Sequence, residues 1–184
     1  MVATKSNMIP LGTKAHPFTL LDTRTGEIIS LSNQTEGKGF LFAFICNHCP
    51  FVIHLKNHFP ALFNQWNKEG VKVYTISAND AVKYPDDSPQ KMAMDAEEFK
   101  FEFPYLYDET QEIAKLYGAV CTPDFFLYDG NQKLFYRGQY DSTRPGTGEE
   151  VTGTDLINAV SLLLSGKSAP SEQRPSLGCN IKWK

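Results

Sequence analysis

The sequence has no long apolar segment and no strong excess of charge of either sign. Its longest apolar run, from Phe40 to Ile45, is far shorter than the roughly 20 residues that span a bilayer. The first ten residues contain no apolar core of the kind found in a secretory signal peptide. The formal net charge is only −3, so nothing indicates a surface for nucleic acid or for an anionic membrane. These absences predict a cytoplasmic protein that binds neither nucleic acid nor a membrane.

Cysteine is also scarce. The 184 residues include four cysteines, at positions 46, 49, 121 and 179, which is too few for a scaffold held together by disulfides. A close pair such as Cys46 and Cys49 is better interpreted as catalytic or metal-binding. The length suits a single domain over 1–184, and an apolar content of 41% is enough to bury a sizeable core.

Hydrophobic periodicity predicts alternating strands and helices, and therefore an α/β sheet with helices on both faces. Apolar residues recur at helical spacing from Phe51 to Trp66, and Pro60 should kink that helix because it lacks a backbone donor. The predicted strands are 18–21 and 27–31, which form an N-terminal hairpin, then 39–45, 71–77, and a second hairpin of 124–128 and 133–138. The other predicted helices are 89–103, 110–117 and 156–164, with an N-terminal extension at 1–17 and an irregular C-terminal tail at 167–184.

The Cys46–Cys49 pair is the strongest functional signal. Cys46 directly follows a buried strand and lies where a helix is expected to begin, and unpaired N–H groups at a helix start lower the pKa of a thiol. Cys49, three residues later, is close enough to attack a mixed disulfide formed at Cys46. The imidazolium form of His48 would further favour the thiolate. We therefore predict that Cys46 attacks, Cys49 resolves and His48 tunes the pKa.

Two other interpretations of the pair stay open. A structural zinc site usually needs a second close pair of ligands, and Cys121 and Cys179 stand alone. Two inert buried cysteines are the other possibility, since a cysteine outside a disulfide is commonly buried. His54 and His58 share a helix face but lack the glutamate of a metalloprotease motif, so a solvated face is the better interpretation. We expect no metal and no cofactor.

A resemblance to a known family enters through two segments. A strand followed by Cys46-Asn-His-Cys-Pro50, with Val120-Cys-Thr-Pro123 and a hairpin far downstream, resembles the thioredoxin-like superfamily. Within it, the chain is similar to the peroxiredoxin-like, AhpC/TSA-related proteins over roughly 18–166. The resemblance implies a thioredoxin fold, a central mixed sheet flanked by helices, here with the N-terminal hairpin as an extension. It also implies that Pro123 is cis and that Thr122 and Pro123 bind substrate, the Thr122 backbone pairing with an extended segment.

Differences from the sequence motifs of these families indicate which reaction to expect. Asn47-His48 replaces the Gly-Pro dipeptide of thioredoxin, and a histidine before the second cysteine resembles the oxidising DsbA pattern. The peroxiredoxin motif would need proline at Phe42 and threonine at Cys46. We therefore predict a thiol–disulfide oxidoreductase in cell redox homeostasis. Its substrate is a protein or small-molecule disulfide or dithiol, and its electron donor a thioredoxin reductase or glutathione system. A thiol peroxidase and a non-catalytic redox-sensing module are the alternatives.

Cys121 and Cys179 form a possible second dithiol. If Pro123 borders the active thiols, Cys121 should lie near them, and Ile181 and Trp183 would gain from docking the tail on the domain. A docked tail could then bring Cys179 beside Cys121. The alternative is a buried Cys121 and a solvent-facing Cys179, because spacing alone does not fix connectivity.

Overall fold

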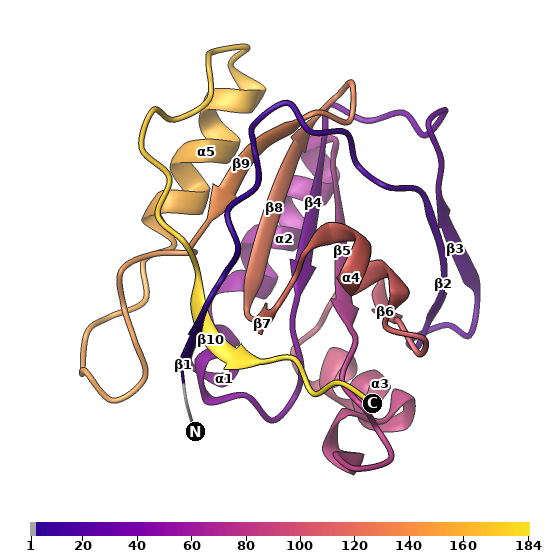
Figure 1. Ribbon diagram of the computed structural model, residues 1–184. Helices are drawn as coiled ribbons and strands as arrows, with labels where there is room; N and C mark the ends of the chain where they lie inside the picture. Colours follow the sequence, from indigo (N-terminus) through magenta and orange to yellow (C-terminus); the bar gives the residue numbers. More distant parts are fainter. Residues whose placement is uncertain (1–2) are drawn as a thin grey trace.

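The computed structural model describes residues 3–184, and its centre is a seven-stranded mixed sheet of order β3-β2-β6-β5-β4-β8-β9 (Figure 1). Central strand β4 pairs in parallel with β5 and antiparallel with β8, which confirms the expected mixed sheet. The hairpin β2–β3 joins the sheet at one edge through β6. The strands are β2 (Phe18–Asp22), β3 (Ile28–Leu31), β4 (Gly39–Phe44), β5 (Val71–Ser77), β6 (Tyr105–Tyr107), β8 (Asp124–Asp129) and β9 (Leu134–Gly138).

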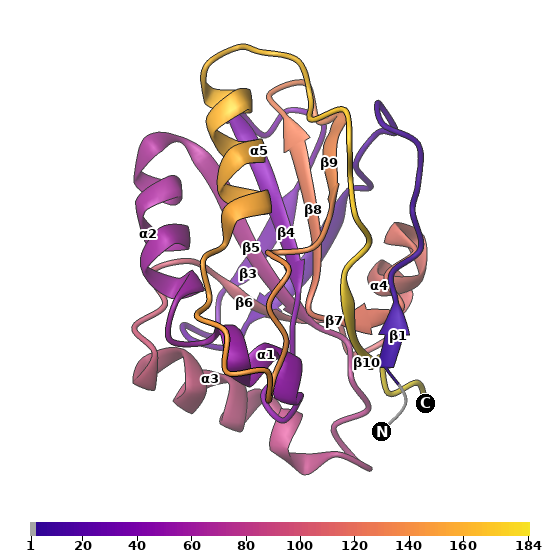
Figure 2. The same cartoon turned by 90° about the vertical axis from the view of Figure 1, so that its left-hand side faces the viewer.

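Strand β4 separates two hydrophobic cores because successive side chains of a strand point to opposite faces. Leu41 and Ala43 belong to one core, and Phe40, Phe42 and Phe44 to the other. Helices α1 (Pro50–Leu55), α2 (Phe59–Glu69), α3 (Pro89–Glu98) and α5 (Thr154–Leu164) supply the first core, and α4 (Glu112–Tyr117) the second. Figure 2 shows α2 and α5 on one side of the sheet and α4 on the other. Across residues 3–184, no helix is long and apolar enough to cross a membrane.

A second, three-stranded sheet joins the two ends of the chain to the segment that precedes Pro123. Its order is β1 (Ala3–Lys5), β10 (Leu177–Asn180) and β7 (Cys121–Thr122), with both pairings antiparallel. The expectation of an irregular tail over 167–184 is therefore wrong at Leu177–Asn180, which form a strand. Strand β10 forms because both of its edges find backbone partners, and a short polar sequence gives no local sign of such pairing.

Two predicted helices have different bounds in the structure. The expected kinked helix is two helices, and Pro60 lies in the first turn of α2, where its missing N–H costs nothing. The helix expected to reach Phe103 ends at Glu98, and Lys100 takes a left-handed conformation with φ of 56°. Strand β6, which follows, was not predicted, because three residues are too few to show a period.

Gly178 allows β10 to approach β7 closely. A Cβ at this position would lie 2.0 Å from the carbonyl oxygen of Thr122, a backbone atom that cannot move aside alone. We expect Gly178→Ala to destabilise the protein by about 3 kcal/mol, the upper end of the range for overpacking. Urea denaturation measures the change, with Asn180→Ala, an exposed residue of the same strand, as control. Equal midpoints for the two variants would contradict the close approach.

Candidate active site

The two cysteines of the pair occupy different structural positions. Cys46 lies in the loop just after β4, and Cys49 is the N-cap residue of α1, with Pro50 at the first helical position. The helix thus begins at the second cysteine, not at the first as expected. The thiols of Cys46 and Cys49 contact each other through a hydrogen bond, and both residues are buried. The two cysteines are therefore equally buried, and they differ in the groups that they contact.

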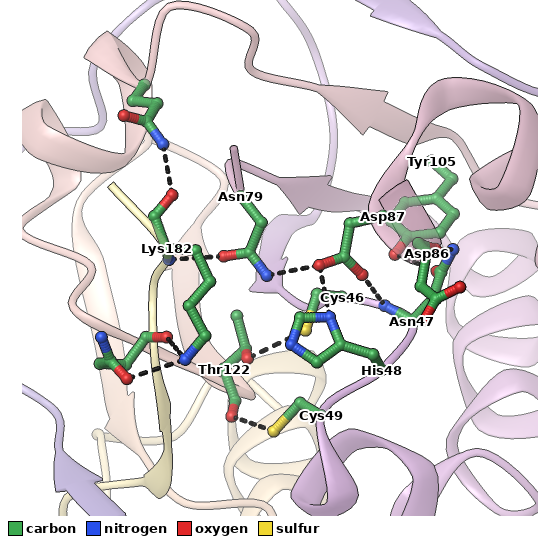
Figure 3. A network of polar contacts seen from close by, with 12 residues as sticks. Cys46, Asn47, His48, Cys49, Asn79, Asp86, Asp87, Tyr105, Thr122 and Lys182 are labelled. Atoms are coloured by element: carbon green, nitrogen blue, oxygen red, sulfur yellow. Dashed lines mark hydrogen bonds and ion pairs between the residues drawn. The ribbon is translucent and has the colours of Figure 1, made fainter. Parts of the chain in front are cut away.

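Thr122 contacts both sulfur atoms (Figure 3). Its Oγ1 lies 3.3 Å from Sγ of Cys46, and its carbonyl oxygen accepts a hydrogen bond from Sγ of Cys49 at 3.1 Å. The Thr122–Pro123 peptide bond is cis, as the resemblance implied. The structure thus brings together residues that are more than 70 positions apart in the sequence.

The acidity of the two thiols is opposite to the expectation. The pKa of Cys49 is lowered to about 5, chiefly because the Cys46 thiol donates to it, with help from Cys179 and the backbone N–H of Val52, and this outweighs burial. The pKa of Cys46 is raised because it holds the shared proton, because it is buried and because the Asp87 carboxylate is near. Both shifts favour Cys49 as the first of the two thiols to ionise, and its hydrogen bond to the Thr122 carbonyl belongs to the protonated form, because a thiolate has no proton to donate.

Asp87 is the partner of His48. Nδ1 of His48 lies 2.6 Å from Oδ2 of Asp87, a fully buried carboxylate that also accepts from the backbone N–H of Asn47 at 2.8 Å and from Nδ2 of Asn79 at 2.7 Å. The hydrogen bond to Asp87 raises the pKa of His48 despite partial burial. The positive charge of the His48 imidazolium is therefore balanced by the Asp87 carboxylate. The same carboxylate raises the pKa of Cys46, which opposes the lowering expected from His48.

Sequence reasoning missed Asp87 because its place in the chain suggested only the start of a helix. It ends a short 3₁₀ helix, η1 (Pro85–Asp87), directly before Ser88, which is the N-cap of α3 as predicted. Asn79, its hydrogen-bond partner, in turn accepts from the backbone N–H of Lys182 at 2.8 Å. The C-terminal segment is thereby tied to the residue that faces Cys46 and His48.

One group of side chains in residues 3–184 has the composition of a metal site. One ligating atom each from Cys46, His48 and Asp87 lie within 4.8 Å of one another. Such a set suits zinc by ligand type. Each of these atoms already has a protein partner, since Cys46 contacts Cys49 and Thr122, and His48 contacts Asp87. The arrangement is therefore complete as a hydrogen-bonded network.

Cys121 and Cys179 lie on neighbouring strands but do not face each other. Strand register places Cys179 opposite Thr122 and Cys121 opposite Asn180, and adjacent residues of a strand point to opposite faces. Cys179 therefore contacts Cys49, whereas Sγ of Cys121 lies 3.9 Å from the carbonyl oxygen of Pro123. All four cysteines are thiols, and Cys179 is buried, so it is not the solvent-facing residue that was the alternative.

The expected substrate edge at Thr122 is already occupied. The resemblance implied that an extended substrate segment would pair with the backbone before Pro123, and in the structure β10 makes that pairing. The tail of the chain thus takes the position expected for a substrate strand at Thr122.

His54 and His58 were expected on a solvated helix face, but in the structure both side chains have hydrogen-bond partners. Nε2 of His54 lies 2.9 Å from Oγ1 of Thr143, and Nδ1 of His58 lies 2.7 Å from the hydroxyl of Tyr140. Both rings are partly buried and connect the start of the helical layer to the segment after β9. Their role in the structure is to hold this segment.

The ionisation of Cys49 can be measured directly. We expect the thiolate absorbance of the reduced protein to rise with an apparent pKa of about 5, because Cys49 is stabilised as an anion by its donors. Cys49→Ser should remove that transition, while Cys121→Ser, on the other face of its strand, should leave it. A first thiolate that appears only above pH 8 would contradict the assignment.

Asp87→Asn tests the His48–Asp87 pair. The pKa of His48 should fall towards its ordinary value of 6.5, which NMR titration of the imidazole measures. The pKa of His48 is raised by folding and that of Asp87 is lowered, so the pair stabilises the fold fully between the ordinary values of 3.8 and 6.5. The wild-type advantage should shrink as the pH rises through the pKa of folded His48.

Asp86, the exposed residue next to Asp87, provides the control for the Asp87→Asn variant. Asp86→Asn removes a charge one residue away but leaves the Asp86 carbonyl, which is the group that contacts Asn47. It should change neither the His48 titration nor the pH dependence of stability. An unaltered His48 pKa in Asp87→Asn would show that the ion pair does not form in solution.

Comparisons with known proteins give a consistent family. The thiol–disulfide oxidoreductase ResA of Bacillus thuringiensis subsp. konkukian is 23% identical over 141 residues, which is 77% of this chain and 76% of ResA. ResA of Halalkalibacterium halodurans is 27% identical over 123 residues, 67% and 65% of the two chains. The structure of an uncharacterized conserved protein from Geobacillus kaustophilus has a TM-score of 0.96 and 47% identity, with 100% of this chain and 97% of that chain covered.

A more distant structure shows the shared fold. The thioredoxin domain of a thiol–disulfide oxidoreductase from Bacteroides vulgatus has a TM-score of 0.56 and 21% identity, with 71% of this chain and 91% of that domain covered. The model of the AhpC/TSA family matches residues 11–137, which is more than half of the chain. The chain therefore has a thioredoxin fold and belongs to the AhpC/TSA family.

Proposed function

We propose that the protein is a thiol–disulfide oxidoreductase whose redox centre is the Cys46–Cys49 pair. The observation that carries the proposal is the contact between these two thiols. Cys49, the N-cap residue of α1, has its pKa lowered to about 5 by this contact. A thiolate is the nucleophile of disulfide exchange, and a second thiol in contact with it completes the reaction. The similarity to two ResA proteins that are named thiol–disulfide oxidoreductases supports this chemistry.

Cys49 is the attacking sulfur in this proposal, which reverses the order expected from the sequence. Cys49 is the N-cap residue of α1, where the nearby first-turn N–H of Val52 favours its charge, whereas Cys46 lies beside the Asp87 carboxylate. The Cys49 thiolate attacks a substrate disulfide, a Cys49–substrate bond forms, and the other substrate sulfur leaves and takes up a proton. Cys46 then loses its proton and attacks Cys49, which releases the second substrate thiol and leaves a Cys46–Cys49 disulfide.

The substrate is a disulfide or dithiol of a protein or small molecule, and a thioredoxin-reductase or glutathione system returns the electrons. A hollow next to the redox centre is lined by Asn47, His48, Ile53, Lys91 and Met94, among others. Ile53 and Met94 are more than half exposed, and Asp86 and Glu98 add charge to the same hollow. Mixed apolar and charged lining suits a peptide segment better than a small apolar ligand.

Variants that keep one thiol of the Cys46–Cys49 pair test the two roles. Oxidised glutathione serves as the probe, and Cys179→Ser is present in both variants so that this neighbouring thiol cannot interfere. We expect Cys46→Ser to form the glutathione adduct at Cys49 at least about tenfold faster at pH 7 than Cys49→Ser forms it at Cys46. Serine keeps a donor at position 46, so the environment of Cys49 is preserved. Adducts are measured by mass spectrometry of the intact protein.

Each other result has a distinct meaning. Faster adduct formation at Cys46 would restore the order of attack expected from the sequence. No adduct in either variant, and no disulfide in the wild-type protein, would contradict the oxidoreductase function and favour a binding module. Rapid consumption of hydrogen peroxide with a thiol reductant, without exchange with disulfides, would favour the peroxidase alternative instead.

A further inference from the structure

The C-terminal strand carries a cysteine to the redox centre. We propose that Cys179 is a third redox thiol, which β10 holds against Cys49 as an internal substrate strand, so that the disulfide can move between Cys46–Cys49 and Cys49–Cys179. This inference rests on the proposed function of the Cys46–Cys49 pair and adds a partner to it. The tail would then be a part of the catalytic cycle as well as of the fold.

The register of β10 supplies the first argument. Cys179 is directly opposite Thr122, the residue whose carbonyl oxygen accepts a hydrogen bond from Cys49. Side chains that are opposite each other in an antiparallel pair lie on the same face of the sheet. Cys179 therefore points to the face on which Thr122 meets the active thiols. Gly178 permits this approach, because a Cβ there would collide with the Thr122 carbonyl.

The contacts of Cys49 supply the second argument. Its thiol is in hydrogen-bonding contact with both Cys46 and Cys179. The three residues belong to the same hydrophobic core cluster, and each is at most 3% exposed. Cys49 is the central sulfur of this group, and a central sulfur is the one through which disulfide exchange must pass.

The strand is held firmly enough to keep Cys179 in place. Beyond β10, the Ile181 N–H donates to the Val120 carbonyl at 3.0 Å, and the Asp80 N–H donates to the Lys182 carbonyl at 2.8 Å. Strand β1 covers the other edge, where Ala3 is opposite Cys179. A thiol fixed next to its target reacts as if it were very concentrated, because little orientational entropy is left to lose.

The proposed step is an exchange that needs no external oxidant. Starting from the Cys46–Cys49 disulfide, the sulfur of Cys179 loses its proton and attacks the sulfur of Cys49. The Cys49–Cys179 bond forms while the Cys46–Cys49 bond breaks, and the electron pair goes to Cys46, which takes up the proton. One disulfide and one thiol are present before and after the step. Cys46 is thereby returned to the thiol form while the oxidising equivalents stay in the protein.

The test uses full-length Cys46→Ser, reduced and then treated with oxidised glutathione. After the remaining thiols are alkylated, peptides are mapped without reduction. We expect most molecules to contain a Cys49–Cys179 disulfide, which forms within about tenfold of the rate at which wild type forms Cys46–Cys49. Adding Cys121→Ser is the matched control and should change nothing, because that side chain lies on the other face. Adding Cys179→Ser should stop the reaction at the glutathione adduct of Cys49.

The outcomes separate this inference from the proposed function. A Cys49–glutathione adduct that persists in Cys46→Ser, although wild type forms Cys46–Cys49, would overturn the third thiol and leave the oxidoreductase intact. Failure of wild type to form Cys46–Cys49 would overturn the proposed function itself. If Cys46→Ser does not fold, as judged by circular dichroism, wild type with one equivalent of oxidant decides. Its peptides should then include both disulfides, and absence of the Cys49–Cys179 peptide would overturn the inference.

Discussion

The arrangement of the sulfur atoms depends on Thr122, which meets three cysteines through three different groups. Its hydroxyl contacts Cys46, its carbonyl oxygen accepts from Cys49, and its backbone is opposite Cys179. The residue two positions later is anchored as well, since Asp124 is fully buried in an ion pair with Arg137. A buried charge persists only with a hydrogen-bonded partner, so this pair fixes where β8 begins. Thr122, the shared partner of the thiols, is therefore held in place by the strands on either side of it.

The pKa values of these thiols decide which of them ionises first. Cys49 does so, because its neighbours donate to it, whereas the pKa of Cys46 is raised by its hydrogen bond to Cys49, by burial and by the nearby Asp87. Burial, together with the contact to the Cys49 thiolate, raises the pKa of Cys179 to about 12. The contact to the thiolate disappears when Cys49 is in a disulfide, so oxidation of the centre removes one reason for Cys179 to keep its proton. Acidity and position thus both make Cys49 the centre of the group.

The sequence was sufficient for the elements that carry a periodic signal. The apolar run that forms β4, the strand β5 and the hairpin of β8 and β9 were all predicted, as was the cis bond before Pro123 through the resemblance. Strand β10 and the role of Asp87 were not predicted. Both depend on partners distant in the chain: Asp87 is 39 positions from His48, and Cys179 is 57 from Thr122. Tertiary pairing of this kind leaves no local periodicity.

The error about Cys179 is instructive because the two parts of the prediction had different physical bases. Docking of the tail was predicted from the apolar residues near its end, and Ile181 is buried, whereas Trp183 is exposed. The partner of Cys179 could not be predicted, because a shift of one residue in register moves every side chain to the opposite face. With Cys121 opposite Asn180, Cys179 faces Cys49. The register of β10 therefore decides whether the tail merely closes the sheet or brings a reactive group to Cys49, and the observed register is the one that brings it.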